Sequence, residues 1–91
     1  MSERIDAIHQ AVEKASGCQA KHVESSVVVE TFRGQTIWEG VVEAFDLTGH
    51  AKAKRAYGWK DGENYTAVLE IPPVDSPNTA VRAAIVAKAQ K

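Results

Sequence analysis

The sequence has few of the features that mark secreted, membrane or fibrous proteins. Its 91 residues contain one cysteine, Cys18, so no disulfide can form within the chain, and a reducing compartment is expected. The apolar runs are short, far below the roughly 20 residues that span a bilayer. The N-terminal segment has no apolar signal core. We therefore expect a soluble, unprocessed, cytoplasmic protein that does not contact a membrane.

The sequence also lacks an excess of charge of either sign. Lys and Arg number 11, and Asp and Glu number 12. Most nucleic-acid-binding proteins recruit phosphate with a general basic field, which is missing here. With 44% hydrophobic and 25% charged residues, the composition is that of an ordinary globular chain. A chain of this length predicts one domain, residues 1–91, that buries roughly two-thirds of the surface its unfolded form exposes.

Hydrophobic spacing predicts a helix near each end of the chain. Residues 3–15 repeat apolar side chains at helical intervals, and Gly17 follows as a left-handed stop. Near the other end, Ser76 occupies an N-cap position and Pro77 the first helical position. The apolar stripes consist of Ile5, Ile8, Val12 and Ala15 in the first helix and Ala80, Val81, Ala84 and Ile85 in the second.

Between the helices the sequence changes to the alternating pattern of β-strands. The segments SSVVVETF, QTIWEGVVEAFDL, AKAKRAYGW and YTAVLEI are expected strands, with turn signals at Arg33-Gly34 and in KDGEN. Strands joined by such short connections form an antiparallel meander. We predict a two-layer α+β fold of order α-β-β-β-β-α, in which the N-terminal and C-terminal helices cover one face of a four-stranded sheet.

The strand register follows from the placement of the turns. A two-residue turn at Arg33-Gly34 sets Val29 opposite Trp38, Val27 opposite Gly40 and Val23 opposite Ala44, which yields one apolar face for the helices. A three-residue loop in KDGEN sets Trp59 opposite Tyr65 and Tyr57 opposite Ala67. A tighter turn at Gly62 is the alternative for this second hairpin.

This register leaves the first two strands apolar on the other face as well. That face carries acidic residues among the apolar side chains, which are Val28, Phe32, Ile37, Val41 and Phe45. A sheet face in contact with water normally alternates more cleanly. We predict that this face binds a second copy of the chain, as in a homodimer, or a partner protein. The alternative is that the loop at residues 16–22, or long Glu and Lys side chains, shield it.

A basic stretch raises nucleic-acid binding as the alternative function. In GHAKAKRAYGW, cations interleave with Tyr57 and Trp59, a pattern that occurs where single-stranded nucleic acid is held. The candidate contacts are His50, Lys52, Lys54 and Lys60. In the predicted sheet, however, both aromatic side chains face the core, and nearby glutamates balance the lysines. We therefore favour a solvated strand edge over a phosphate-binding ridge.

Motifs for metal binding and catalysis are scarce. Cys18-x-x-x-His22 has a spacing that occurs in zinc sites, but no second pair accompanies it, so we expect no metal and no cofactor. There is no P-loop, dinucleotide fingerprint or nucleophile elbow. Glu39 and Glu43 lie on one face of a strand but roughly 13 Å apart, too far for the paired carboxylates of a glycosidase. We expect a binding module rather than an enzyme.

A third possibility is a small-molecule site between the sheet and the helices. Four aromatic residues, Trp38, Tyr57, Trp59 and Tyr65, are expected to lie near one another in this region. An aromatic cluster of this kind suits a ligand pocket and suits a well-packed core equally well.

Two segments carry a resemblance to other proteins. TIWEGVVEAFDLTGHAKAKRAYGW and AVLEIPPVDSPNTAVRAAIVAK resemble a group of small bacterial proteins without an assigned activity. In that group a W-E-G-V-V-E strand, a G-H turn, a K-R-x-Y-x-W strand and an I-P-P-V-x-S-P helix entry recur. The resemblance covers about two-thirds of the chain and implies a single natural domain.

The topology is also loosely similar to that of the double-stranded-RNA-binding domain, which has the order helix, three strands, helix. The spacing of serine and alanine in that family's last helix is matched here by Ser76, Ala80, Ala83 and Ala84. The lysines that follow the serine in that family are replaced by Pro77 and Asn78, and a fourth strand is expected. The similarity therefore implies a topology and assigns no RNA-binding residues.

Overall fold

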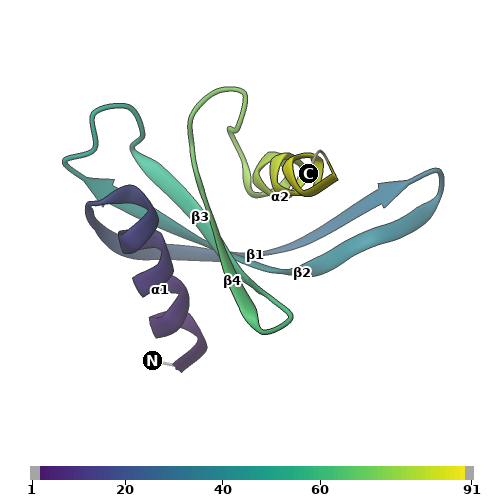
Figure 1. Cartoon of the computed structure of the whole chain (residues 1–91), viewed down its shortest axis with the longest axis horizontal. Helices are drawn as coiled ribbons and strands as arrows, with labels where there is room; N and C mark the ends of the chain where they lie inside the picture. Colours follow the sequence, from purple (N-terminus) through teal and green to yellow (C-terminus); the bar gives the residue numbers. More distant parts are fainter. Residues whose placement is uncertain (1–2, 90–91) are drawn as a thin grey trace.

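The structure is a computed structural model that describes residues 3–89. Its elements are α1 (Glu3–Ser16), β1 (Gln19–Phe32), β2 (Gln35–Thr48), β3 (Arg55–Asp61), β4 (Asn64–Leu69) and α2 (Pro77–Ala89). The strands form one antiparallel sheet in the order β1-β2-β3-β4 (Figure 1). The α+β fold and the order α-β-β-β-β-α are therefore confirmed. No helix among residues 3–89 is long and apolar enough to cross a membrane.

The helix ends follow the local signals in the sequence. Gly17 adopts a left-handed φ of 70° after α1, and its N–H donates to Glu13 O at 2.9 Å. At the start of α2, the Ser76 hydroxyl accepts from the N–H of Thr79 at 3.2 Å, which is the bond of an N-cap. Pro77 is the first helical residue, as predicted.

The two helices pack on opposite faces of the sheet, so the prediction that both cover one face is wrong. Successive residues of β3 pack against different helices. Tyr57 and Trp59 belong to the hydrophobic core under α2, whereas Ala56 belongs to the core under α1. Figure 1 shows α1 and α2 on either side of β3 and β4. The physical reason is that β3 is apolar or small at successive positions, which is typical of a strand covered on both faces.

Each face has its own core. The core under α2 contains Val28, Val42, Ala44, Tyr57, Trp59, Val74, Ala80 and Val81. The core under α1 contains Ile8, Val12, Phe45 and Ala56. Gly58 lets α1 approach closely, because a Cβ there would lie 2.6 Å from Cγ2 of Ile8.

The predicted register of the first hairpin is wrong by one residue. The two-residue turn is where the sequence places it, with φ of 53° at Arg33 and 78° at Gly34. A β-bulge then inserts Ile37 as an extra residue, so Trp38 pairs with Glu30. Val28 consequently lies opposite Gly40. Between Glu30 and a second bulge, at Val23, every side chain of β1 therefore lies on the face opposite to the predicted one.

The second hairpin has the tighter of the two turns considered. Asp61 pairs with Asn64, so Gly62 and Glu63 form a two-residue turn, and Gly62 has a φ of 63°. Trp59 therefore lies opposite Thr66, and the three-residue loop is wrong. The third strand also begins later than predicted, at Arg55, because residues 49–54 form a loop.

The first hairpin is longer than the rest of the sheet. Strands β1 and β2 have 14 residues each, but β3 pairs with β2 only from Glu43 to Asp46. The remaining part of the hairpin, residues 26–42, projects past β3 and β4 as a two-stranded arm that curves beside α2 (Figure 1). Val28, Trp38 and Val42 lie on the side of the arm that α2 covers.

Candidate functional site

The other side of the arm, which we call the open face, has no helix over it. It carries Val27 and Val29 on β1 and Glu39 and Val41 on β2. Val27 is 76% exposed, Val29 44% and Val41 38%. Such exposure is unusual for valines in a strand, because neighbouring side chains or a second layer normally cover them.

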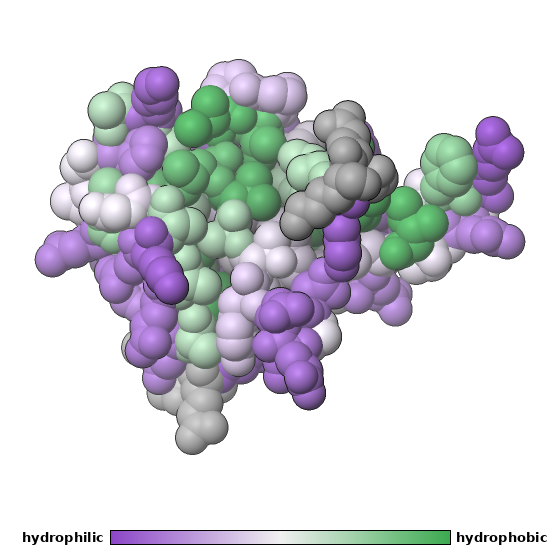
Figure 2. Space-filling model, viewed as in Figure 1, coloured by the Kyte–Doolittle hydropathy of each residue, from purple (hydrophilic) through white to green (hydrophobic). Residues whose placement is uncertain are grey.

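The tip of the arm carries two larger exposed apolar side chains, of which Phe32 lies on the α2 side of the arm because it alternates with Val28 and Glu30 along β1. Phe32 is 60% exposed beside the turn, and Ile37, the bulge residue, is 50% exposed. The guanidinium of Arg33 lies over the Phe32 ring at 5.2 Å from its centroid. In Figure 2 hydrophobic atoms alternate with polar ones along the projecting arm.

Three members of the predicted partner face, Val28, Phe32 and Phe45, do not belong to the open face. Val28 is 1% exposed and packs under α2, and Phe45 is fully buried under α1. The one-residue shift at Ile37 accounts for Val28. Phe45 retains its predicted side of the sheet, but α1 covers it, and its ring contacts the rings of His9 and His22 at centroid distances of 5.7 and 5.3 Å. Phe32 is exposed at the tip but shares the side of Val28, and Ile37 and Val41 are exposed as the prediction requires.

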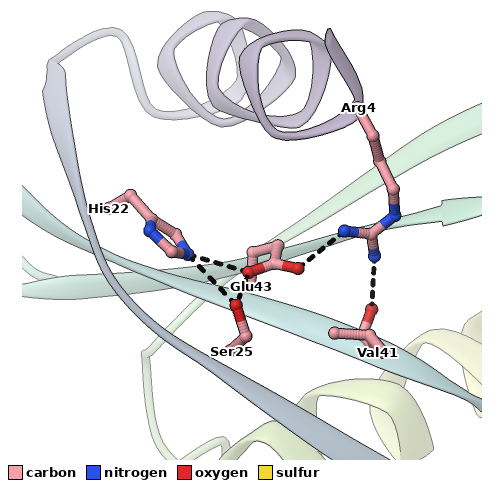
Figure 3. Close-up of polar contacts among 5 residues, drawn as sticks. All are labelled: Arg4, His22, Ser25, Val41 and Glu43. Carbon is pink, nitrogen blue, oxygen red and sulfur yellow. Dashed lines mark hydrogen bonds and ion pairs between the residues drawn. The ribbon is translucent and has the colours of Figure 1, made fainter. Parts of the chain in front are cut away.

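A buried carboxylate lies where the open face meets α1. Glu43 of β2 is 1% exposed, and three side chains, one from α1 and two from β1, surround its two oxygens (Figure 3). Arg4 Nη1 of α1 donates to Oε2 at 2.7 Å, and Arg4 Nη2 donates to the carbonyl of Val41 at 3.0 Å. His22 Nε2 lies 2.8 Å from Oε1, and the Ser25 hydroxyl donates to the same oxygen.

The electrostatic balance at Glu43 favours the ionised form. Burial alone raises the pKa of this carboxyl, but the hydrogen bonds from Arg4, Ser25 and His22 outweigh burial, and the net pKa lies below its usual value. The group resembles a serine, histidine and carboxylate set, yet its geometry differs from that of a catalytic triad. Ser25 and His22 Nε2 both point at one carboxylate oxygen, whereas a triad places the imidazole between the other two groups. We interpret the cluster as a clamp that holds α1 to the sheet.

This clamp makes stability depend on pH in a defined direction. The unfolded carboxyl titrates near 4.5 and the folded one lower, so the stabilisation is complete above 4.5 and disappears as the pH falls through the folded value. We expect the Tm of the wild type to fall more steeply between about pH 5 and about pH 3 than that of Glu43→Gln. Circular dichroism melts would measure this difference.

The exposed Glu39→Gln variant is the matched control, and it should keep the wild-type slope because its carboxylate is not buried. Glu30 also has a lowered pKa, through its hydrogen bond from Arg82, so a residual slope is expected in every variant. Parallel curves for the wild type and Glu43→Gln would contradict the assignment of the clamp.

A second ion pair holds α2 to the arm. Arg82 Nε donates to Glu30 Oε1 at 2.9 Å, and Glu30 is 8% exposed on the same side as Val28. On the same face of the sheet, the buried Tyr57 hydroxyl donates to Glu70. Burial and this hydrogen bond raise the pKa of Tyr57 to about 12. The Arg82–Glu30 pair therefore holds α2 to the arm, and the Tyr57–Glu70 bond joins β3 to the segment after β4.

Three residues of the predicted nucleic-acid surface, His50, Lys52 and Lys54, lie in the loop before β3, whereas Lys60 lies near the other end of that strand. His50 Nδ1 accepts from the N–H groups of Lys52 and Ala53 at 3.0 and 2.9 Å, so its ring organises the loop. Lys52, Lys54 and Lys60 are exposed. The aromatic platform that this prediction needs is missing, because Tyr57 and Trp59 are buried.

The candidate metal ligands do not converge. Cys18 Sγ contacts the carbonyl of Ser16, His9 Nε2 contacts the carbonyl of Ala20, and His22 contacts Glu43. Within residues 3–89, no three His, Cys, Asp or Glu side chains are grouped to hold an ion.

A cavity of about 420 Å³ lies between α2 and the β3–β4 hairpin. Trp38 and Trp59 line it and meet edge to face, with centroids 5.9 Å apart, and Lys88 and Asp61 stand among its polar lining residues. Tyr57 and Tyr65, which we grouped with the tryptophans, do not line it. The volume lies in the range of small-molecule pockets.

Sequence reasoning treated Glu43 as a solvated charge and missed the clamp. The signal that was present is a carboxylate within the apolar run of GVVEAF, which in a strand covered on both faces must be buried and paired. Comparison with known proteins adds no relative: no family model, curated protein or solved structure matches the chain.

Proposed function

We propose that this protein is a small interaction module that self-associates through the open face and the tip of the arm. The observation that carries the proposal is the set of exposed apolar side chains on a two-stranded projection, namely Val27, Val29, Phe32, Ile37 and Val41. A hairpin is marginally stable unless further strands or a helix cover it, and only one side of this arm has such cover. A second copy over the open face would bury Val27, Val29 and Val41, and contact at the tip of the arm would cover Phe32 and Ile37.

The charges of the arm favour a protein surface over a phosphate chain. Residues 26–42 include one cation, Arg33, and two acids, of which Glu30 is buried against Arg82. A nucleic acid needs several cations along its path. A second copy of the arm, in contrast, meets little charge repulsion, since Arg33 and Glu39 are the exposed charges and have opposite signs.

Phe32→Lys and Val41→Lys are the variants that test this function. Each places a charge on the apolar surface without entering either core, so we expect the oligomer to weaken by about 100-fold. The free energy of unfolding of the monomer should change by less than about 0.5 kcal/mol. Light scattering after gel filtration and urea denaturation would measure the two effects.

Ile71→Lys is the matched control, because Ile71 is 37% exposed but lies outside the arm. It should leave the oligomer intact. A wild type that stays monomeric up to millimolar concentration would refute the proposal. Oligonucleotide binding that weakens steeply with salt and is lost on Lys52→Ala and Lys54→Ala would support the nucleic-acid alternative instead.

A further inference from the structure

Strand β1 is the long edge of the sheet, and the direction of its backbone groups can be derived. The N–H of Leu47 on β2 donates to Lys54 O at 2.8 Å, so Leu47 points its backbone groups toward β3. Backbone direction alternates along a strand, so Glu43, Val41 and Glu39 of β2 also point away from β1. In an antiparallel ladder, the β1 residues opposite them likewise point their N–H and C=O groups away from β2, toward the open edge. These residues are Ser25, Val27 and Val29.

Along this edge, the backbone groups have hydrogen-bond partners where α1 reaches the strand. At Ala20 the N–H donates to Glu13 Oε2 at 2.9 Å, and the carbonyl lies 2.6 Å from His9 Nε2. Among residues 3–89, the outward backbone groups of Ser25, Val27 and Val29 have no such partner. The free stretch thus begins where the cover of α1 ends.

The devices that usually protect an edge strand are missing from this stretch. Proteins block such edges with lysine, proline, a bulge or an inward-pointing charge. Residues 25–29 read Ser-Ser-Val-Val-Val, without a charge or proline, and the nearest bulge is at Val23. Charges flank the stretch without entering it: Glu24 lies 3.6 Å from Arg55, and Glu30 points inward against Arg82. An unprotected, β-branched edge of this kind is a template for another strand.

We propose that β1 pairs with β1 of a second copy, antiparallel, around a two-fold axis at Val28, so that the two sheets become one. This inference rests on the proposed self-association and adds to the contact through the open face a second contact, along the edge of β1. The two-fold symmetry lets one segment serve both partners. The open faces of the two copies then lie side by side, and Val27 of each copy stands opposite Val29 of the other.

Charge and the grouping of valines favour the axis at Val28 over the neighbouring axes. Only residues whose backbone groups point outward can form the hydrogen-bonded pairs, which leaves axes at Ser26, Val27, Val28 or Val29. An axis at Ser26 sets Val27 opposite Ser25 and so separates the valines. An axis at Val27 sets Glu24 opposite Glu30 of the second copy, and like charges directly opposite are destabilising. The axis at Val28 sets Ser26 opposite Glu30 and gathers valines on the open face. An axis at Val29 instead sets Val27 opposite Thr31, so it separates those valines.

Amide hydrogen exchange on the wild-type oligomer tests the edge directly. In the monomer the N–H groups of Val27 and Val29 face water, whereas that of Val28 bonds to β2. We expect exchange at Val27 and Val29 to slow by about 100-fold between dilute monomer and concentrated oligomer. Rapid exchange at both positions in a proven oligomer would overturn edge pairing and leave self-association standing. A persistent monomer would overturn both.

Cysteine cross-linking tests the register in a Cys18→Ser background. Opposed residues in a hydrogen-bonded pair have Cα atoms about 5.5 Å apart, within disulfide range, whereas an offset of two residues takes them beyond about 7 Å. Val27→Cys and Val29→Cys should therefore form a disulfide-linked heterodimer when mixed under oxidation, and neither should cross-link alone. Efficient self-linking of either variant alone would overturn the axis at Val28.

A proline variant separates the edge from the open face. Val27→Pro removes an N–H that makes no bond within one chain, and edge strands tolerate such a proline. We expect it to weaken the oligomer by about 100-fold while leaving the melting curve of the monomer unchanged. Val27→Thr, which keeps the N–H and the β-branched shape, should retain the oligomer. Full association of Val27→Pro would overturn the proposal.

Discussion

Arg4→Met is expected to lower the free energy of unfolding at neutral pH by about 3 kcal/mol, because it leaves a buried carboxylate without its guanidinium. Arg4 Nη1 lies 2.7 Å from Glu43 Oε2, and the Glu43 side chain is 1% exposed. Removing one member of a buried ion pair typically costs 3 to 5 kcal/mol. The partial exposure of Arg4 places this pair at the lower end. Urea denaturation measures the change.

Lys14→Met is the matched control for this prediction. It makes the same kind of replacement on the same helix at an exposed position, and should change the free energy by less than about 0.5 kcal/mol. The double variant Arg4→Met with Glu43→Gln should recover part of the loss, since the amide carries no charge. Strict additivity of the two single changes would show that the charge is not the cause.

Gly58→Ala is expected to destabilise the protein by about 2 kcal/mol or more, through overpacking between β3 and α1. An added Cβ would lie 2.6 Å from Cγ2 of Ile8 and 2.9 Å from Cγ2 of Val12. Both neighbours are fully buried and β-branched, so neither can rotate away without moving the helix. Chemical denaturation gives the magnitude, and NMR shift changes concentrated in α1 rather than α2 would locate the strain.

Gly40→Ala is the matched control, because its Cβ would approach the far end of the Trp38 ring at 2.9 Å. That ring is partly exposed and can move, so the cost should be smaller. Equal effects at the two glycines would contradict the close approach of α1 to Gly58. A stabilised Gly58→Ala variant would contradict the placement of α1 on this face.

Much of the secondary structure was readable because its signals are local. Ser76 and Pro77 define the start of α2, Gly17 ends α1, and Arg33-Gly34 forms the first turn, each through backbone or capping preferences of a few residues. The tight turn at Gly62 was one of two alternatives, and cross-strand pairing selected it.

The candidate site was only partly readable. Phe32 and Ile37 are exposed because the tip of the arm lies beyond the cover of both helices, although Phe32 lies on the side of Val28, and Val41 is exposed on the open face. Val28 and Phe45 are buried, each under a different helix. The Glu43 clamp was missed, since Glu43, its partner Arg4 and the pair His22 and Ser25 come from three separate elements and no spacing rule connects them.

By itself the sequence determined the class of the domain, the order of its elements and the positions of the turns and caps. The tertiary structure decided which side chains face outward. One extra residue at Ile37 reverses the faces of the strand opposite it, because side chains in a strand alternate with a period of two. The tertiary structure also decided that the helices pack on opposite faces, since β3 is apolar on both sides and Gly58 lets α1 approach closely. That division leaves one side of the arm and the edge of β1 free.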